Sequence, residues 1–418
     1  MSISPNTQAI LLLTAPLING HRSKDAPKTL SQGQYRKVAK FLHERALSPS
    51  DFLLQDSNSL VDECQSSIEI PPLFPLLGRG FQLSQALERW SQRSIWVLSR
   101  ADADYPQRLR KRLGDLAPPV LYGCGNPDLL NRGGLAVVGS RNISDEIIRF
   151  TNDVGRLAAN ANLALISGGA RGVDQAAMQG AGETGGYVVG ILADNLERAS
   201  LKHEHREALQ NGSMVLCSPY DPKAGFIAGH AMQRNKFIYA LSDAALVVNS
   251  DYKKGGTWTG AVEQLDKLKL VPIFVRTGSQ PNQAMGSLLN RGASQWPCPR
   301  NAKELVSVID SSKITMSNAP QRNLFDNPNN SSNNEQDRTT SNDIQSKPPK
   351  PSKSDPAQSL FMLAERLILE MEMPINEEAV SKQLDVSKTQ ARKWIISLCE
   401  SEKLQKKTRP VRYTKIDS

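Results

Sequence analysis

Between residues 133 and 298 the chain alternates short apolar segments with longer segments of helical spacing, which constrains its fold more than any other feature. A short segment that is apolar at nearly every position is typical of a parallel strand, because helices cover both faces of a parallel sheet. The alternation therefore predicts an α/β fold with a doubly wound parallel sheet. The predicted strands lie near 135–139, 163–167, 186–192, 213–217, 244–249 and 270–275.

Two of the predicted strands end in glycine-containing turns that are followed by an arginine. The first strand continues as Gly139–Arg141 and the second as Ser167–Asp174. Small residues suit any tight turn, but in an open parallel sheet such turns also place backbone N–H groups and a helix N-terminus where an anion can bind. We therefore expect Arg141 and Arg171 to converge on one phosphate-bearing ligand, and Asp174 to cap the helix after the second turn.

The glycine spacing in the second turn argues against two common nucleotide-binding motifs. A dinucleotide-binding turn needs glycines at positions i, i+2 and i+5, whereas Gly168, Gly169 and Gly172 stand at i, i+1 and i+4. The chain contains no Gly-Lys dipeptide, which excludes a P-loop. The turns therefore predict a phosphate-binding site that is neither a dinucleotide-binding turn nor a P-loop.

Two further segments place polar or basic residues at a predicted helix start. Gln233–Lys236 combines arginine and lysine with an amide, a set that suits phosphate oxygens and base edges. Lys254–Glu263 supplies two glycines and two threonines at the start of the next helix. An ordinary solvent-exposed helix start is the alternative for each segment taken alone.

The order of these motifs resembles the DNA-processing protein A family, also called DprA or Smf, over residues 96–298. The resemblance includes Asp104–Pro106 and Pro118–Tyr122 before the first turn, and Met285–Ala293 after the last one. It implies an extended Rossmann-like fold, accompanied by a helical N-terminal module and a C-terminal winged-helix domain. Each motif is weak alone, whereas their combined order is specific.

The resemblance implies a protein that binds single-stranded DNA and catalyses no reaction. Members of the family load the RecA recombinase onto incoming strands in natural transformation, and they act as dimers. Single-stranded DNA, RecA and a second copy of the chain are therefore the implied partners. The implied DNA-contacting residues are Ser140, Arg141, Gly168, Gly169, Ala170, Arg234, Asn235, Lys236, Gly256 and Thr257.

One segment departs from the family's pattern. An aromatic residue followed by proline usually precedes the basic motif and can stack on a base, whereas this chain has Ala231 and Met232 there. Phe226 and His230 are aromatic side chains nearby, at a different spacing. The phosphate contacts are therefore expected, and the source of base stacking is open.

Other chemistries remain as alternatives or are disfavoured. The glycine-threonine segment is similar to a loop of nucleoside-monophosphate phosphoribohydrolases, so the same pocket could bind nucleotides or hydrolyse them with Glu263. A regulator that binds duplex DNA through the C-terminal domain is the second alternative. His203 and His205 are two residues apart in a predicted helix, where side chains diverge. No metal and no cofactor is therefore expected.

Composition divides the chain into four segments. Residues 1–95 have helical patterning, and residues 96–311 hold the motifs. Residues 312–357 are so poor in apolar side chains that we expect a disordered linker, because such a segment cannot offset its ordering entropy. Residues 358–418 regain helical spacing and end in the basic stretch 392–415, which predicts a winged-helix domain. A recognition helix with a basic wing suits duplex DNA, and a protein-binding winged helix with solvated charges is the alternative.

The overall composition indicates a multidomain protein of the cytoplasm. The chain has 418 residues, a formal charge of +9 and five scattered cysteines without a C-x-x-C pair, which argues against a disulfide framework or a zinc ribbon. No apolar segment approaches the roughly 20 residues that span a bilayer. The N-terminus lacks the basic start of a secretory signal. We therefore expect a cytoplasmic location without membrane contact.

Overall fold

The computed structural model describes residues 3–17, 27–278, 282–317, 368, 375–383, 388–400, 404–408 and 411–415. The chain forms two compact units, Met1–Asp326 and Asn327–Ser418. Within the described ranges, no helix is long and apolar enough to cross a membrane.

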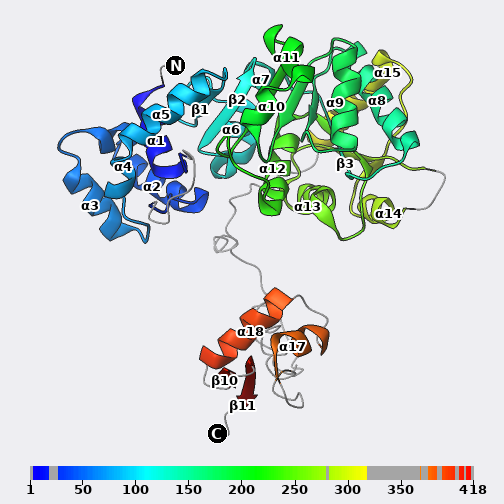
Figure 1. The fold of residues 1–418 in the computed structure, drawn as a ribbon. Coiled ribbons are helices and arrows are strands. Elements are labelled where there is room, and N and C mark those ends of the chain that lie inside the picture. The colour runs from blue at the N-terminus through cyan, green and yellow to red at the C-terminus, as the bar shows by residue number, and fades with distance from the viewer. Residues whose placement is uncertain are drawn as a thin grey trace, which may run out of the picture. The chain divides into compact units, whose positions relative to one another are not determined.

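A mixed sheet forms the centre of the first unit (Figure 1). In spatial order its strands are β1 (Trp96–Ser99), β2 (Val120–Gly125), β6 (Met214–Ser218), β5 (Val188–Ile191), β4 (Leu165–Ser167), β3 (Leu135–Gly139), β7 (Ala244–Asn249), β8 (Ile273–Val275) and β9 (Ser294–Gln295). The strands from β6 to β9 in this order are parallel to one another. Strand β2 pairs antiparallel with β6, and β1 pairs antiparallel with β2. All six predicted strands form, as β3 to β8, and the predicted α/β fold with a mostly parallel sheet is confirmed.

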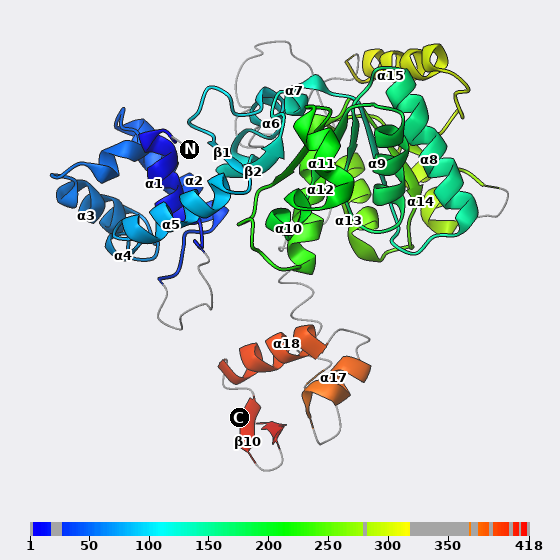
Figure 2. The ribbon, with the colours of Figure 1, turned by 45° about the horizontal axis from the view of Figure 1, so that its top comes forward.

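Helices cover both faces of this sheet (Figure 1, Figure 2). They are α6 (Gln107–Leu113), α7 (Leu129–Arg132), α8 (Asp145–Asn160), α9 (Val173–Glu183), α10 (Leu196–Ser200), α11 (His203–Gln210), α12 (Ala228–Leu241), α13 (Gly255–Glu263), a π-helical turn (Gln264–Leu268), α14 (Gln283–Asn290) and α15 (Ala302–Ser317). Side chains of a strand alternate between its two faces. Leu135 and Val137 of β3 therefore pack with α8, α9, α10 and α15, whereas Ala136 and Val138 pack with α6, α7, α12, α13 and α14.

The strand order reverses at β3, and this reversal positions the site. The chain proceeds from β3 to β6 on one side of β3 and then crosses to β7, β8 and β9 on the other side. Loops that leave neighbouring strands in opposite directions open a crevice at the carboxyl ends of the strands, where ligands of such sheets bind. The two predicted glycine turns leave β3 and β4 at this edge.

The N-terminal helices share a core with the sheet. They are α1 (Pro5–Thr14), α2 (Gln32–Glu44), a 3-10 turn (Pro49–Leu53), α3 (Asn58–Ser67), α4 (Phe74–Leu77) and α5 (Gly80–Ser91). Trp90 of α5 packs edge-on against Tyr122 of β2, with 5.0 Å between the ring centroids. The buried Arg79 donates to the backbone carbonyls of Leu12 and Ala15 at the end of α1. The helical patterning predicted for residues 1–95 is present, and its apolar faces continue the core of the sheet.

Helix α15 continues beyond the predicted start of the linker at residue 312. The buried Leu305 and Ile309 anchor this helix in the sheet core, and helical structure propagates from them to Ser317. Residues 312–317 are therefore helical, which corrects the first part of the predicted linker. Its remainder, 318–357, lies outside the described residues.

The second unit contains α17 (Glu377–Gln383), α18 (Lys388–Glu400) and the antiparallel pair β10 (Leu404–Thr408) and β11 (Val411–Lys415). Ile395 and Leu398 of α18 are buried with Leu404 of β10. Within residues 358–374, only Ile368 lies in the described residues. The winged-helix assignment for 358–418 stays a prediction.

Candidate nucleic-acid interface

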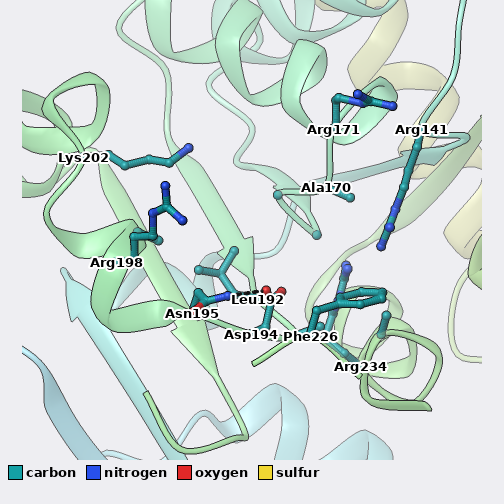
Figure 3. A pocket seen from close by; sticks show the side chains of 15 residues that line it. Arg141, Ala170, Arg171, Leu192, Asp194, Asn195, Arg198, Lys202, Phe226 and Arg234 are labelled. Carbon is teal, nitrogen blue, oxygen red and sulfur yellow. Dashed lines mark hydrogen bonds between the residues drawn. The ribbon is translucent and has the colours of Figure 1, made fainter. Parts of the chain in front are cut away.

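A cavity of about 780 Å³ lies at the carboxyl ends of β3, β4 and β5 (Figure 3). The turn after β3 contributes Arg141, and the loop after β5 contributes Asp194 and Asn195. Helix α10 contributes Arg198, and helix α12 contributes Arg234. The full lining is Arg141, Gly168, Gly169, Ala170, Arg171, Leu192, Ala193, Asp194, Asn195, Arg198, Ala199, Lys202, Phe226, Ala231 and Arg234.

Glycines let the two turns close on each other and on Arg234. Gly169 and Gly172 have positive φ angles of 67° and 89°, which side-chain-bearing residues rarely adopt. A Cβ atom at Gly168 would overlap Nη1 of Arg234. The guanidinium of Arg234 therefore occupies the space that a side chain at position 168 would take.

Arg234 and Asp174 form a buried pair beneath the cavity. Each residue is only 5% exposed, and Nη1 of Arg234 lies 3.9 Å from Oδ2 of Asp174. Burial lowers the pKa of Arg234, against the opposing effect of Asp174. Burial also raises the pKa of Asp174, although Arg234 and the backbone N–H groups of Ala170, Gly139 and Gly168 lower it. The pair thus fixes both turns relative to α12.

The role of Asp174 differs from the predicted helix cap. Gly172 is the N-cap residue of α9, and Asp174 lies inside the helix. Its carboxylate accepts hydrogen bonds from the backbone N–H groups of Ala170, Gly139 and Gly168. The Asp174 side chain contacts these backbone groups because the segment after β3 lies against the start of α9. The sequence pattern of a helix cap does not reveal this tertiary contact.

The guanidinium of Arg234 is incompletely satisfied by the protein. Its Nε and Nη1 atoms are buried and have no hydrogen-bond partner among the described residues. A buried N–H donor without a hydrogen-bond acceptor is unfavourable unless a ligand supplies one. Figure 3 shows the Arg234 side chain pointing toward Arg141 and the cavity. An anion in the cavity is the natural complement of this group.

Arg141 and Phe226 form the exposed side of the cavity. Cζ of Arg141 lies 4.7 Å from the centroid of the Phe226 ring, and Phe226 is 50% exposed. Of the two nearby aromatic side chains, Phe226 therefore lines the cavity. His230 does not, and instead stacks on Tyr220 with 3.8 Å between the ring centroids. The loop before α12 thus offers one accessible aromatic face beside an arginine.

The lining of the cavity is strongly cationic. The lining contains five basic side chains and one carboxylate, that of Asp194. This carboxylate accepts a hydrogen bond of 2.7 Å from Nδ2 of Asn195. A concave surface lined mostly by one sign of charge concentrates oppositely charged ligands. The five basic residues are Arg141, Arg171, Arg198, Lys202 and Arg234.

Half of the predicted contact residues lie outside the cavity lining. Nδ2 of Asn235 donates to the Gly256 carbonyl over 2.8 Å, and Oγ1 of Thr257 donates to the Gly139 carbonyl over 2.9 Å. The backbone N–H of Ser140 donates to the Asn249 carbonyl. Lys236 lines a second hollow of about 330 Å³ between α12 and α13. Four of these residues therefore connect the loops that frame the cavity. The structure brings together Arg141, Gly168, Gly169, Ala170 and Arg234.

The sequence matches one protein family. The family model described as DNA recombination-mediator protein A matches residues 96–310, which is just over half of the chain. The chain belongs to this family. The matched region holds the sheet and every residue that lines the cavity.

Relatives of the chain carry names from the same family. DNA processing protein DprA of Streptococcus pneumoniae is 31% identical over 145 residues, which cover 34% of this chain and 51% of the relative. The match thus spans about half the length of that relative. A crystal structure of the Streptococcus pneumoniae protein has a TM-score of 0.53 at 20% identity, covering 73% of this chain and 98% of that one.

A further similar structure is that of DNA processing protein A from Helicobacter pylori, determined in work on its single-stranded DNA binding mode. It has a TM-score of 0.43 at 23% identity and covers 52% of this chain and 96% of that one.

Sequence reasoning missed one wall of the cavity. Arg198 lies in the short helix α10, and Lys202 lies in the short connection between α10 and α11. No glycine turn or basic run marks them, and only the fold brings them opposite Arg141. His203 and His205 lie in α11, and no cluster of metal-ligating side chains occurs in the described part of the chain.

Proposed function

We propose that this protein binds single-stranded DNA in the cationic cavity without catalysing a reaction, and delivers the strand to a RecA-type recombinase. Arg234 carries the proposal, because it is a buried guanidinium with unpartnered nitrogens beneath a cavity lined by further basic groups. Phosphate is the anion that DNA presents, and arginine binds phosphate with strong charge-assisted hydrogen bonds. The family membership supports DNA as the ligand.

The exposed Phe226 ring favours a single strand over a duplex. Base stacking on an aromatic side chain requires a base that is not already stacked in a helix. A single strand can place a phosphate near Arg141 and a base on Phe226 together, since these two side chains are in contact. A duplex can place only its phosphates in this cavity, because its bases are already stacked on one another. We propose Phe226 as the stacking residue in place of the usual aromatic position.

The proposal also covers the oligomeric state of the chain and the role of each of its segments. We propose that the chain acts as a homodimer in the cytoplasm. Residues 1–95 act as a helical module, residues 96–311 bind the strand, and residues 358–418 are a winged-helix domain that adds affinity for duplex DNA. The contacts proposed for Ser140, Asn235, Gly256 and Thr257 are then indirect, through the loops that they hold in place. Lys236 lines the second hollow instead.

The hydrolase alternative is less well supported by the geometry. Glu263, which would carry the hydrolysis, lines the second hollow with Lys236 rather than the cavity. Among the described residues, the carboxylate that lines the cavity is that of Asp194, which is already bonded to Asn195. A base-releasing reaction would need an acid or nucleophile beside the bound nucleotide, and Glu263 is not placed there.

Replacement of Arg141 by alanine tests the proposal. The variant should bind a fluorescent single strand about tenfold more weakly at low salt, since one charge-assisted phosphate contact is lost. The slope of log K against log salt concentration should fall by about 0.7, as expected for one contact to a single strand. Anisotropy titrations across a salt series measure both quantities.

Arg149→Ala is the matched control. Arg149 is exposed on α8 and does not line the cavity, so both quantities should stay at their wild-type values. The same titrations on a duplex of identical sequence separate the regulator alternative, in which duplex binding is the tighter interaction. An Arg141→Ala protein with unchanged single-strand affinity and slope would contradict the proposed site.

A further inference from the structure

An ion-pair cluster joins the N-terminal helices to the wall of the cavity. Nε of Arg93 lies 2.7 Å from Oε1 of Glu197, and Nε of Arg89 lies 3.7 Å from Oε2 of the same carboxylate. Arg89 belongs to α5, Arg93 follows it, and Glu197 belongs to α10. Glu197 is only 8% exposed. Its burial distinguishes this cluster from ordinary surface ion pairs, which contribute little.

Helix α10 depends on external contacts for its position. It has five residues, and a helix of this length is not stable on its own. The Asn195 N–H donates to the Ala224 carbonyl over 2.8 Å, and the Glu197 N–H donates to the Pro222 carbonyl over 3.0 Å. The Glu197 carboxylate, held by Arg89 and Arg93, adds the contact with the N-terminal helices.

The same short helix carries one side of the cavity. Asn195, Arg198 and Ala199 line the cavity, and so does Lys202 just beyond the end of α10. Glu197 and Arg198 are adjacent in sequence but project in different directions, since successive helical residues are rotated by about 100°. Glu197 therefore contacts the N-terminal helices while Arg198 contacts the cavity. A displacement of α10 would move both basic side chains of this wall.

We propose that Glu197 is a positioning residue, which holds α10 against the N-terminal helices and so places Arg198 and Lys202 for the DNA backbone. This inference rests on the proposed function. It assigns residues 1–95 a role in DNA affinity although none of them lines the cavity. Anything that changes the environment of Arg89 and Arg93 would then change the strength of strand binding.

Glu197→Gln in the full-length chain tests this proposal, because glutamine keeps the shape and removes the charge. We expect single-strand affinity to fall about tenfold at low salt, and the slope of log K against log salt to fall by about 0.7 to 1.4, for one or two displaced phosphate contacts. A purely structural role would lower thermal stability without changing the slope. Glu88→Gln, which removes an exposed carboxylate from α5, is the matched control and should bind like the wild type.

A double-mutant cycle identifies the route of the effect. If Glu197 acts through Arg198, then Glu197→Gln should add little to the loss caused by Arg198→Ala. Arg93→Gln breaks the shorter ion pair from the other side and provides the test should Glu197→Gln fail to fold, while Arg93→Lys should restore most of the affinity. Wild-type affinity and slope in folded Glu197→Gln, or fully additive losses, would overturn the positioning role. An absence of strand binding by the wild type would instead overturn the proposed function.

Discussion

Arg234→Met is expected to lower the free energy of unfolding by about 3 kcal/mol, since it leaves Asp174 buried without its cation. Methionine fills a similar volume with a flexible apolar side chain, so the loss reports mainly the charge. The same change should weaken single-strand binding by about 30-fold, as expected when a ligand loses a charge-assisted hydrogen bond. Urea denaturation and anisotropy titration measure the two effects separately.

The double variant Arg234→Met/Asp174→Asn separates stability from binding. Removing the second charge should recover much of the lost stability, because no uncompensated carboxylate stays buried. DNA affinity should not recover, because the phosphate-binding group is still absent. Recovery of affinity in the double variant would contradict a direct role for Arg234.

The stability deficit of Arg234→Met should also depend on pH. Burial raises the pKa of Asp174 in the folded protein, and loss of Arg234 removes an effect that lowers it. A carboxyl group with a raised folded-state pKa destabilises the fold above its unfolded pKa, near 4. The deficit should therefore be smaller at pH 4 than at pH 7.

Gly168→Ala is expected to weaken strand binding by about 30-fold, as much as the loss of Arg234 itself. The new Cβ would overlap Nη1 of Arg234 and would lie 2.5 Å from Nη2, so the guanidinium must leave its position. The φ angle of Gly168 is outside the positive range, so the backbone itself accepts alanine. Overpacking of this kind destabilises by about 1–3 kcal/mol. Anisotropy and urea denaturation measure both effects.

Gly182→Ala is the control for this substitution. Gly182 lies in α9, and a Cβ there would meet no atom within 4 Å. Alanine should leave DNA binding unchanged and stabilise the helix by about 0.5–1 kcal/mol. Wild-type affinity in Gly168→Ala would show that the position of the Arg234 guanidinium does not control binding.

The strands and the two turns were predictable for physical reasons. A parallel strand covered on both faces is apolar at most positions, so β3 to β8 stand out in the sequence. Gly168 and Gly169 also stand out, because the tight turn and the close approach of Arg234 require glycine. Arg141 follows the first turn directly, and the sheet topology then dictates that both turns meet at one edge.

The rest of the site depended on tertiary contacts that no local pattern encodes. Asn235 and Thr257 carry donor groups suited to DNA, yet the fold uses them to join the backbone of neighbouring loops. Lys236 is only two residues from Arg234 but faces the second hollow, because side chains two residues apart on a helix are rotated by about 200°. Arg198 and Lys202 lack any motif and enter the cavity only through the path of α10.

Photocrosslinking tests the central claim, that the strand is bound in the cavity of the α/β sheet, most directly. A single-stranded oligonucleotide containing 5-iododeoxyuridine is irradiated with the full-length chain, and the modified peptides are identified by mass spectrometry. We expect the main adduct on Phe226, since it is the accessible aromatic side chain of the cavity lining, and its loss in Gly168→Ala. Adducts confined to residues 388–415, or to the hollow lined by Lys236, would contradict this account.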